Sequence, residues 1–192
     1  MKELKGKKIA ILATNGFEES ELFEPRKALE NNGAEVYIIS PEKGTIKAWN
    51  YGDWSKEVKV DVIVDDAKES DYDVLVIPGG VINPDKLRRN LKAVDFVGRF
   101  FDNNKIVASI CHGQQMLIEA EVVNGRTMTS FSSIKKDLQN AGANWIDSEV
   151  VVDNNLITSR SPDDLEAFNR TIIEEIARVK QPARGQRTFS NI

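Results

Sequence analysis

The sequence predicts an α/β fold built on a mostly parallel central sheet. Short continuous apolar runs, such as 8–13 and 73–77, have the length and composition of strands that are buried on both faces. Stretches of helical periodicity alternate with these runs, as in βαβ units whose helices cover both faces of a sheet. A chain of 192 residues is long enough to bury one sizeable core. We therefore expect one domain over residues 1–180, followed by a flexible C-terminal extension at 181–192, which lacks apolar periodicity.

The expected elements follow one another in a regular order. A first strand at 8–13 leads into a helical pattern that runs to Glu30 and stops at the Asn-Asn-Gly of 31–33. Residues 41–53 lack a clear period and predict a loop or a small hairpin. Further strands are expected at 35–40, 58–64, 73–77, 106–110, 126–129, 149–152 and 156–159. Further helices are expected at 84–102, 114–120, 132–141 and from 162 onward.

The composition argues against several classes of site and partner. One cysteine cannot form a disulfide within the chain, and one cysteine with one histidine cannot supply the usual nitrogen and sulfur ligands of a zinc site. A net charge of −4 with interspersed signs offers no basic field for nucleic acid, and no apolar run has the length of a membrane span. We therefore expect a cytoplasmic protein without a metal, a cofactor, a nucleic-acid partner or a membrane anchor.

The single cysteine, Cys111, stands where the apolar run 106–110 gives way to the helical stretch 114–120. A strand that turns sharply into a helix places the turn residue at the tip of the sheet. There the first N–H groups of the helix and its dipole favour a thiolate over a thiol. A buried structural cysteine is the alternative, but the junction and the following His-Gly favour a reactive one.

Two other segments are expected beside this cysteine, because functional groups of parallel sheets collect at the carboxyl ends of the strands. They are the loop after the first strand and the Pro-Gly-Gly of 78–80. Glu18 and Glu21 in the first loop are three residues apart, so both can lie on one helix face. Glu21 is a candidate to share a proton with Cys111, and Glu18 to line the same pocket. Alternatively, these acids only complement the helix dipole.

The glycines and the histidine near the cysteine have candidate roles of their own. Gly79 and Gly80 could form an oxyanion hole with the amide of His112 or Gly113, or could merely allow a tight turn. His112 can act as an acid or base if its ring turns toward the thiol, and otherwise it only ends the strand. Asp85, from the same chain or a neighbouring one, is the local candidate to orient that ring.

Six segments together resemble the PfpI family of the DJ/ThiJ/PfpI superfamily, and the resemblance runs from about Lys7 to Lys180. They are 17–21, 77–80, 108–113, 140–143, 149–152 and 158–168. The resemblance implies a flavodoxin-like three-layer sandwich, similar to that of class I glutamine amidotransferases. It also implies cytoplasmic homodimers or larger oligomers. The activities it implies are intracellular peptidase, glyoxalase and protein deglycase, often in the stress response.

The resemblance also assigns roles to four residues of the predicted site. Cys111 matches the nucleophile of the family, and His112 matches the histidine that follows it. Glu21 matches the acid that hydrogen-bonds the cysteine, and Glu18 the first acid of the phenylalanine–acid motif.

Two positions depart from the PfpI pattern, and one missing residue distinguishes the chain from the related amidotransferases. Asp85 lies where some members place a glutamate that reaches the histidine of an adjoining subunit, and it is the shorter acid. Gln114 replaces a common proline, and we expect its side chain to reach into the pocket and alter substrate preference. Amidotransferases need a distant histidine near the C-terminus, whereas this chain has no histidine after His112.

The leading functional hypothesis is a cofactor-independent cysteine enzyme that acts on small aldehydes such as methylglyoxal and glyoxal, or on their adducts with proteins. One alternative is an intracellular cysteine peptidase that oligomerisation completes. A second is a non-enzymatic redox sensor or chaperone in which Cys111 oxidises to a sulfinic acid beside Glu21. A nucleotide-binding role lacks support because the glycines form no phosphate-binding motif.

Three aromatic residues, Trp49, Tyr51 and Trp54, are crowded into the irregular segment before the third expected strand. Aromatic side chains there could plug the core or cover a contact between subunits, since interfaces favour tryptophan and tyrosine. The lack of strand periodicity favours a subunit contact in a homo-oligomer.

Overall fold

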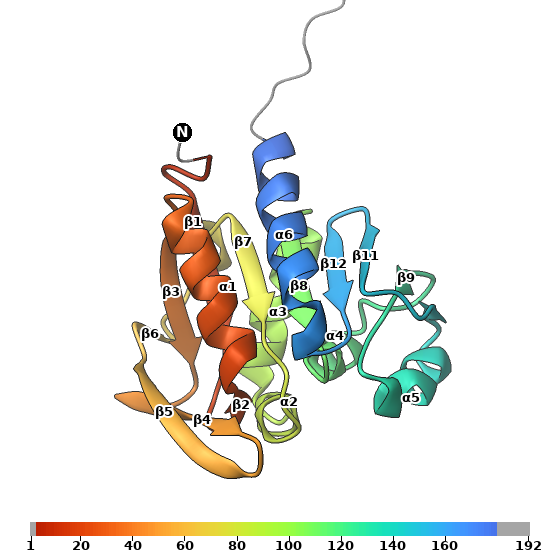
Figure 1. The fold of residues 1–192 in the computed structure, drawn as a ribbon, viewed down its shortest axis with the longest axis horizontal. Coiled ribbons are helices and arrows are strands. Elements are labelled where there is room, and N and C mark those ends of the chain that lie inside the picture. The colour runs from red at the N-terminus through yellow and green to blue at the C-terminus, as the bar shows by residue number, and fades with distance from the viewer. Residues whose placement is uncertain (1–2, 180–192) are drawn as a thin grey trace, which may run out of the picture.

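The computed structural model describes residues 3–179, and a seven-stranded sheet in the order β11-β12-β8-β7-β1-β3-β6 runs through it. Figure 1 shows the strand arrowheads of β3, β7 and β12 pointing to one edge, as expected for a parallel sheet. The strands are β1 (Lys8–Leu12), β3 (Glu35–Ser40), β6 (Val62–Ile63), β7 (Val74–Ile77), β8 (Ile106–Ile110), β11 (Val150–Asp153) and β12 (Leu156–Ser159). Within this sheet only β11 pairs antiparallel, in a hairpin with β12.

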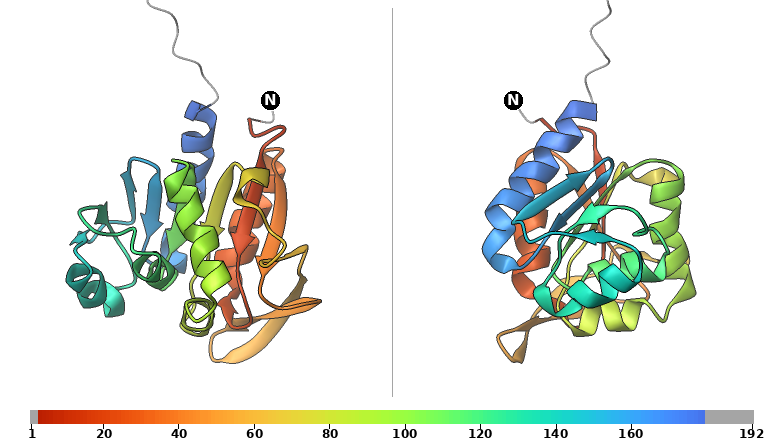
Figure 2. Two further views of the ribbon diagram at one scale, coloured as in Figure 1. Left: turned by 180° about the vertical axis from the view of Figure 1, so that it is seen from behind. Right: turned by 90° about the vertical axis from the view of Figure 1, so that its right-hand side faces the viewer.

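Helices cover both faces of the sheet, so the fold has three layers, as predicted (Figures 1 and 2). Helices α1 and α6 pack on one face, where their apolar side chains join those of β1 and β7 in one core cluster. Helices α3 and α4 pack on the other face around a second cluster. The helices are α1 (Glu19–Asn31), α2 (Ile82–Leu87), α3 (Leu91–Asp102), α4 (Gln114–Glu119), α5 (Lys135–Asn140) and α6 (Leu165–Val179).

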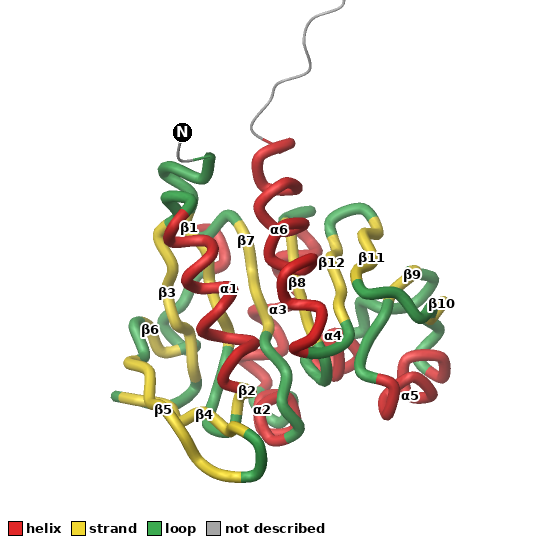
Figure 3. Tube along the Cα trace, viewed as in Figure 1, coloured by secondary structure: helices red, strands yellow, loops and turns green. Residues whose placement is uncertain are grey.

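One small sheet lies at the carboxyl edge of the central sheet, and another lies beside β11. A three-stranded sheet joins β2 (Phe17–Glu18), β4 (Thr45–Asn50) and β5 (Asp53–Lys59), so the segment expected as a loop or small hairpin at 41–53 is a short bend followed by most of a hairpin that runs on to Lys59. Strands β9 (Thr127–Met128) and β10 (Asn144–Trp145) form the other. The loops and short elements along this edge are visible as green and yellow tube at the bottom of Figure 3.

Two expected elements are divided in the structure. The helix expected at 84–102 is two helices, because Asn90 has an extended backbone and its side chain accepts the Ala93 N–H at 3.0 Å to cap α3. The strand expected at 58–64 is divided between the end of β5 at Lys59 and β6, which pairs with β3. Between them Asp61 accepts the Ile38 N–H at 2.8 Å. The extension predicted at 181–192 lies outside the described residues.

No helix within residues 3–179 has both the length and the apolar character that crossing a membrane requires.

Candidate active site

The candidate nucleophile lies on a sharp turn between β8 and α4. Cys111 has a φ of +64°, in the left-handed region that non-glycine residues seldom adopt. Its N–H donates to the Ser159 carbonyl oxygen at 3.1 Å, which extends the pairing of β8 with β12. Immediately beyond, the Gly113 N–H donates to the Ile110 carbonyl oxygen at 2.9 Å. The turn therefore holds Cys111 at the carboxyl edge of the sheet, with 6% of the residue exposed.

The Glu21 carboxyl group, in the first turn of α1, faces the Cys111 side chain. Its Oε2 accepts the Gly79 N–H at 2.7 Å. A Cβ atom on Gly79 would lie 2.8 Å from both Glu21 Oε2 and Cys111 Cβ, so the two side chains meet across this glycine. Glu21 is fully buried, and burial raises its pKa to about 8. A carboxyl group with that pKa holds its proton at neutral pH and exchanges it readily near pH 8.

Burial raises the pKa of the Cys111 thiol as well, and a charge on Glu21 raises it further. The N–H groups of Gly80 and His112 act in the opposite direction, because their hydrogen bonds to the sulfur stabilise a thiolate. Burial and the Glu21 charge outweigh these two hydrogen bonds, so the pKa of Cys111 is raised overall and the side chain is a thiol at neutral pH. The sequence predicted a thiolate at this turn, and that prediction is wrong for the resting state. Since Cys111 and Glu21 lie too close for both to ionise easily, they titrate as a pair.

The His112 ring has a partner on each nitrogen. Nδ1 lies 3.2 Å from Cys111 Sγ, and Nε2 lies 2.9 Å from Ser133 Oγ. The ring also stacks on Phe131, with centroids 4.9 Å apart. Burial lowers the pKa of His112, so the imidazole is neutral at neutral pH. The structure thus turns His112 toward the thiol, as its acid–base role requires.

Asp85 does not orient that ring within the chain. It is an exposed residue in the first turn of α2, and Ser133 already occupies the outer nitrogen of His112. An action of Asp85 on a neighbouring subunit stays a prediction.

Of the four backbone N–H groups predicted to stabilise an oxyanion, two already have hydrogen-bond acceptors within the protein. The Gly79 N–H is engaged by Glu21, and the Gly113 N–H by the Ile110 carbonyl, which corrects the expectation for both glycines. Gly80 and His112 keep N–H groups directed at the sulfur. These two amides are the remaining predicted donors.

The side chain of Gln114 does not reach into a pocket, contrary to prediction. It is fully buried, and its Nε2 lies 3.3, 3.0 and 2.9 Å from the carbonyl oxygens of Ser109, Thr129 and Ser159. Because carbonyl oxygens only accept hydrogen bonds, the amide nitrogen must face them. Gln114 therefore ties β8, β12 and the segment after β9 together behind the elbow and supports the position of Cys111.

Glu18 lies at the end of β2, half-buried, and its pKa is raised by burial and by the neighbouring charge of Glu19. It lines a depression of about 570 Å³ between the β4–β5 hairpin and the start of η3 (Pro162–Asp164). Trp49 and Tyr51 lie on the hairpin side of this depression. Glu18 also raises the pKa of Glu21 through its charge, so it influences the candidate pair without contacting the thiol.

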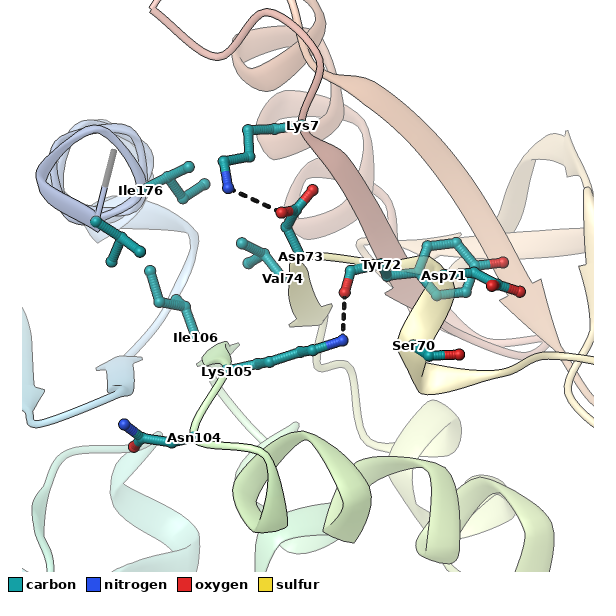
Figure 4. A pocket seen from close by; sticks show the side chains of 11 residues that line it. Lys7, Ser70, Asp71, Tyr72, Asp73, Val74, Asn104, Lys105, Ile106 and Ile176 are labelled. Atoms are coloured by element: carbon teal, nitrogen blue, oxygen red, sulfur yellow. Dashed lines mark hydrogen bonds and ion pairs between the residues drawn. The ribbon is translucent and has the colours of Figure 1, made fainter. Parts of the chain in front are cut away.

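A second depression, of about 310 Å³, lies at the opposite edge of the sheet (Figure 4). Lys7 Nζ lies 2.8 Å from Asp73 Oδ1, and Lys105 Nζ lies 2.8 Å from the Tyr72 carbonyl oxygen. These lysines are thus engaged by the protein itself, and the chemistry expected at 18–21, 79–80 and 111–112 is gathered at the other edge.

The described residues contain no group of three or more histidine, cysteine, aspartate or glutamate side chains close enough to hold a metal ion.

Replacing Gly79 by alanine is expected to reduce turnover by about 100-fold and stability by about 1–3 kcal/mol. The added Cβ would approach Cys111 Cβ, Glu21 Oε2 and the His112 nitrogen, each at 2.8 Å. Gly98→Ala on α3 is the matched control, because nothing lies within 4 Å of the added atom. Urea unfolding of both variants measures the change in stability, and steady-state kinetics measure the change in turnover. Equal effects of the two substitutions would show that the contact across Gly79 is unimportant.

A family model and two similar proteins indicate the same protein family. The model of the DJ-1/PfpI family matches residues 7–175. The Bacillus subtilis (strain 168) protein YraA, named provisionally as a cysteine protease, is 47% identical over 164 residues, covering 85% of this chain and 95% of that protein. "Deglycase PH1704" of Pyrococcus horikoshii is 46% identical over 167 residues, covering 87% and 98%.

A solved structure supports the same assignment. A two-domain protein of Anabaena variabilis, with DJ-1/ThiJ/PfpI-like and ferritin-like domains, matches with a TM-score of 0.84 and 36% identity. The match covers 94% of this chain and 52% of that one, so this chain spans about half the length of the two-domain protein. With the three-layer fold and the family model extending over most of its length, the chain belongs to the DJ-1/PfpI family.

Proposed function

We propose that this chain is a cofactor-independent cysteine enzyme that acts on small reactive aldehydes such as methylglyoxal and glyoxal, or on their protein adducts. The observation that carries the proposal is the Cys111 thiol beside a carboxyl group, Glu21, whose pKa is about 8. A group with that pKa can take the thiol proton and return it near physiological pH. The relative named as a deglycase supports this class of substrate.

In the first step the sulfur of Cys111 adds to the aldehyde carbon while the thiol proton passes to His112, or to Glu21 in those molecules in which its carboxyl group is ionised. The carbon–sulfur bond forms as the carbonyl π bond opens onto oxygen, and protonation of that oxygen completes a hemithioacetal. The developing negative charge lies within reach of the N–H groups of Gly80 and His112. This addition needs no cofactor, because the sulfur supplies the electron pair.

A glyoxalase reaction then needs only proton transfers and water. Ionised Glu21 removes the hydrogen on the former aldehyde carbon as a proton, the electron pair shifts onto the neighbouring carbonyl oxygen, and that oxygen takes a proton from water to give an enediol. Return of a proton to the neighbouring carbon converts the sulfur-bearing carbon into a thioester. Water hydrolyses the thioester, releases a 2-hydroxy acid and frees the thiol. The net change is one aldehyde plus one water to one hydroxy acid, with the carbon skeleton unchanged.

The burial of Cys111 favours a small substrate over a polypeptide. With 6% of the residue exposed, the sulfur is accessible to a small aldehyde more easily than to a peptide bond held in an extended chain. Peptidase activity is one competing function, and the relative named provisionally as a cysteine protease supports it. A peptidase would need a substrate groove that oligomerisation completes. A redox sensor in which Cys111 oxidises to a sulfinic acid beside Glu21 is the second competing function, and it needs the same loss of the thiol proton.

We also propose a cytoplasmic homo-oligomer that serves in the response to aldehyde stress. The exposed aromatic residues of the β4–β5 hairpin support self-association, since Tyr51 is fully exposed and Trp54 is 43% exposed. The single cysteine suits a reducing compartment.

The test is a substrate panel on the purified wild-type chain. Methylglyoxal, glyoxal, a glycated peptide and casein are incubated separately, and hydroxy acid, released amine and peptide fragments are quantified. We expect hydroxy acid from the two aldehydes and no cleavage of casein. Peptide fragments without hydroxy acid would replace this proposal with the peptidase.

A further inference from the structure

We propose that Ser133 is the positioning residue of His112, so that the imidazole is oriented from within one chain by a hydroxyl group. Ser133 Oγ lies 2.9 Å from His112 Nε2, while Nδ1 of the same ring lies 3.2 Å from Cys111 Sγ. The arrangement is a relay of thiol, imidazole and hydroxyl. Its role in turnover rests on the proposed function, but its effect on the thiol does not.

Ser133 belongs to a short segment, 130–133, that contacts the Cys111–His112 turn in three ways. The Phe131 N–H donates to the Cys111 carbonyl oxygen at 3.1 Å. The Phe131 ring stacks on the imidazole at an interplanar angle of 27°, which favours the two orientations of the imidazole that lie roughly parallel to Phe131 and differ by a half-turn about the Cβ–Cγ bond. The Ser133 hydroxyl distinguishes these two orientations, because it meets the outer nitrogen in only one of them.

The segment is itself anchored to the fold. Trp145 Nε1 donates to Ser130 Oγ at 3.0 Å, and Ser130 Oγ donates to the Phe131 carbonyl oxygen at 2.8 Å. Ile134, the next residue after Ser133, is buried in the core cluster around α3 and α4. The hydroxyl is therefore presented by a fixed segment, although Ser133 itself is exposed.

The partner of Nε2 bears on which nitrogen of the neutral ring carries the proton. A neutral imidazole carries one N–H, and burial lowers the pKa of His112 so that the ring stays neutral. When Nε2–H donates to Ser133 Oγ, the lone pair of Nδ1 faces the sulfur and can accept the thiol proton. A carboxylate in the same place, such as an Asp85 from another subunit, would instead stabilise the imidazolium. Ser133 thus favours the tautomer in which the neutral imidazole can act as a base toward Cys111.

His112 is the single histidine of the chain, so its ring nitrogens can be observed without assignment. The experiment uses full-length protein labelled with ¹⁵N-histidine, at a matched oligomeric state. Two-dimensional NMR reports the tautomer, and intact mass reports the rate at which iodoacetamide alkylates Cys111 between pH 6 and pH 9. The variants are Ser133→Ala, Ser133→Thr, Asp85→Asn and Ser132→Ala, an exposed serine one position away.

We expect the wild type to hold the Nε2–H tautomer. Ser133→Ala should mix the tautomers and slow alkylation by about tenfold. Ser133→Thr, which keeps the hydroxyl, should restore both readouts, and Ser132→Ala should match the wild type. An unchanged tautomer and rate in Ser133→Ala, or a loss confined to Asp85→Asn, would overturn the proposal. Neither readout uses an aldehyde, so a chain inactive toward aldehydes would refute the proposed function and leave this result standing.

Discussion

Replacing Cys111 by alanine is expected to lower aldehyde turnover by about 1,000-fold or more, to the level of the uncatalysed reaction. The chain has no second cysteine that could take over the addition step. Alanine at φ +64° has nearly the same backbone cost as cysteine, so the fold should survive the substitution. The measurement is hydroxy-acid formation from methylglyoxal by wild type and variant, with circular dichroism and the oligomeric state as controls. A folded Cys111→Ala variant with full activity would exclude covalent catalysis by this residue.

Replacing Glu21 by glutamine is expected to lower turnover by about 100- to 10,000-fold. Glutamine keeps the shape of the side chain and an oxygen for the Gly79 N–H, which lies 2.7 Å from Glu21 Oε2. It cannot, however, take the proton of Cys111 or remove the proton from the hemithioacetal. Steady-state kinetics with methylglyoxal measure the effect. A kcat within a factor of two of the wild type would show that His112 alone moves the protons.

The same substitution is expected to change how stability depends on pH. The pKa of Glu21 in the folded chain, about 8, lies above the ordinary value of 4.5, so the folded chain holds this proton more tightly than the unfolded chain. The stability that Glu21 contributes is fully present below pH 4.5 and is lost as pH rises through 8. Glu21→Gln should remove that loss and be more stable than the wild type at pH 9 by a few kcal/mol, since a tenfold change in proton affinity corresponds to about 1.4 kcal/mol. Urea unfolding at pH 5 and pH 9 gives the comparison, and parallel pH dependences would contradict the burial of an uncharged Glu21.

The local pattern of the sequence located the reacting groups well. The apolar run before Cys111 and the helical run after it correspond to β8 and α4. The three-residue spacing of Glu18 and Glu21 placed them on the first turn of α1 and its N-cap. Such features depend on residues close in the chain, which is why pattern alone could find them.

The charge of the sulfur could not be predicted in the same way. The dipole of the helix after Cys111 favours a thiolate, but α4 has only six residues and the sulfur is nearly dehydrated. Desolvation depends on what the rest of the chain packs over Cys111, and Glu21 adds its own charge across Gly79. Both effects arise from tertiary contacts that the neighbouring sequence does not encode.

The partners of His112 and Gln114 were missed for a related reason. Ser133 is 21 residues beyond His112, and a serine in an irregular segment has no periodicity that would mark it. Gln114 looked like a pocket residue because it replaces proline, but its amide meets carbonyl oxygens from three segments of the chain. No sequence pattern marks Ser133. It could have been sought only by asking which residue hydrogen-bonds the outer nitrogen of the His112 ring.

The pairing of Cys111 with Glu21 is tested most directly by the pH dependence of Cys111 alkylation in the wild type and in Glu21→Gln. Because the chain has one cysteine, intact mass after iodoacetamide follows this sulfur alone. The wild-type rate should rise about tenfold per pH unit and level off near pH 8, where the pair loses its first proton, and the variant should lack that inflection. Identical profiles for the two proteins would show that the sulfur and the carboxyl group do not share a proton.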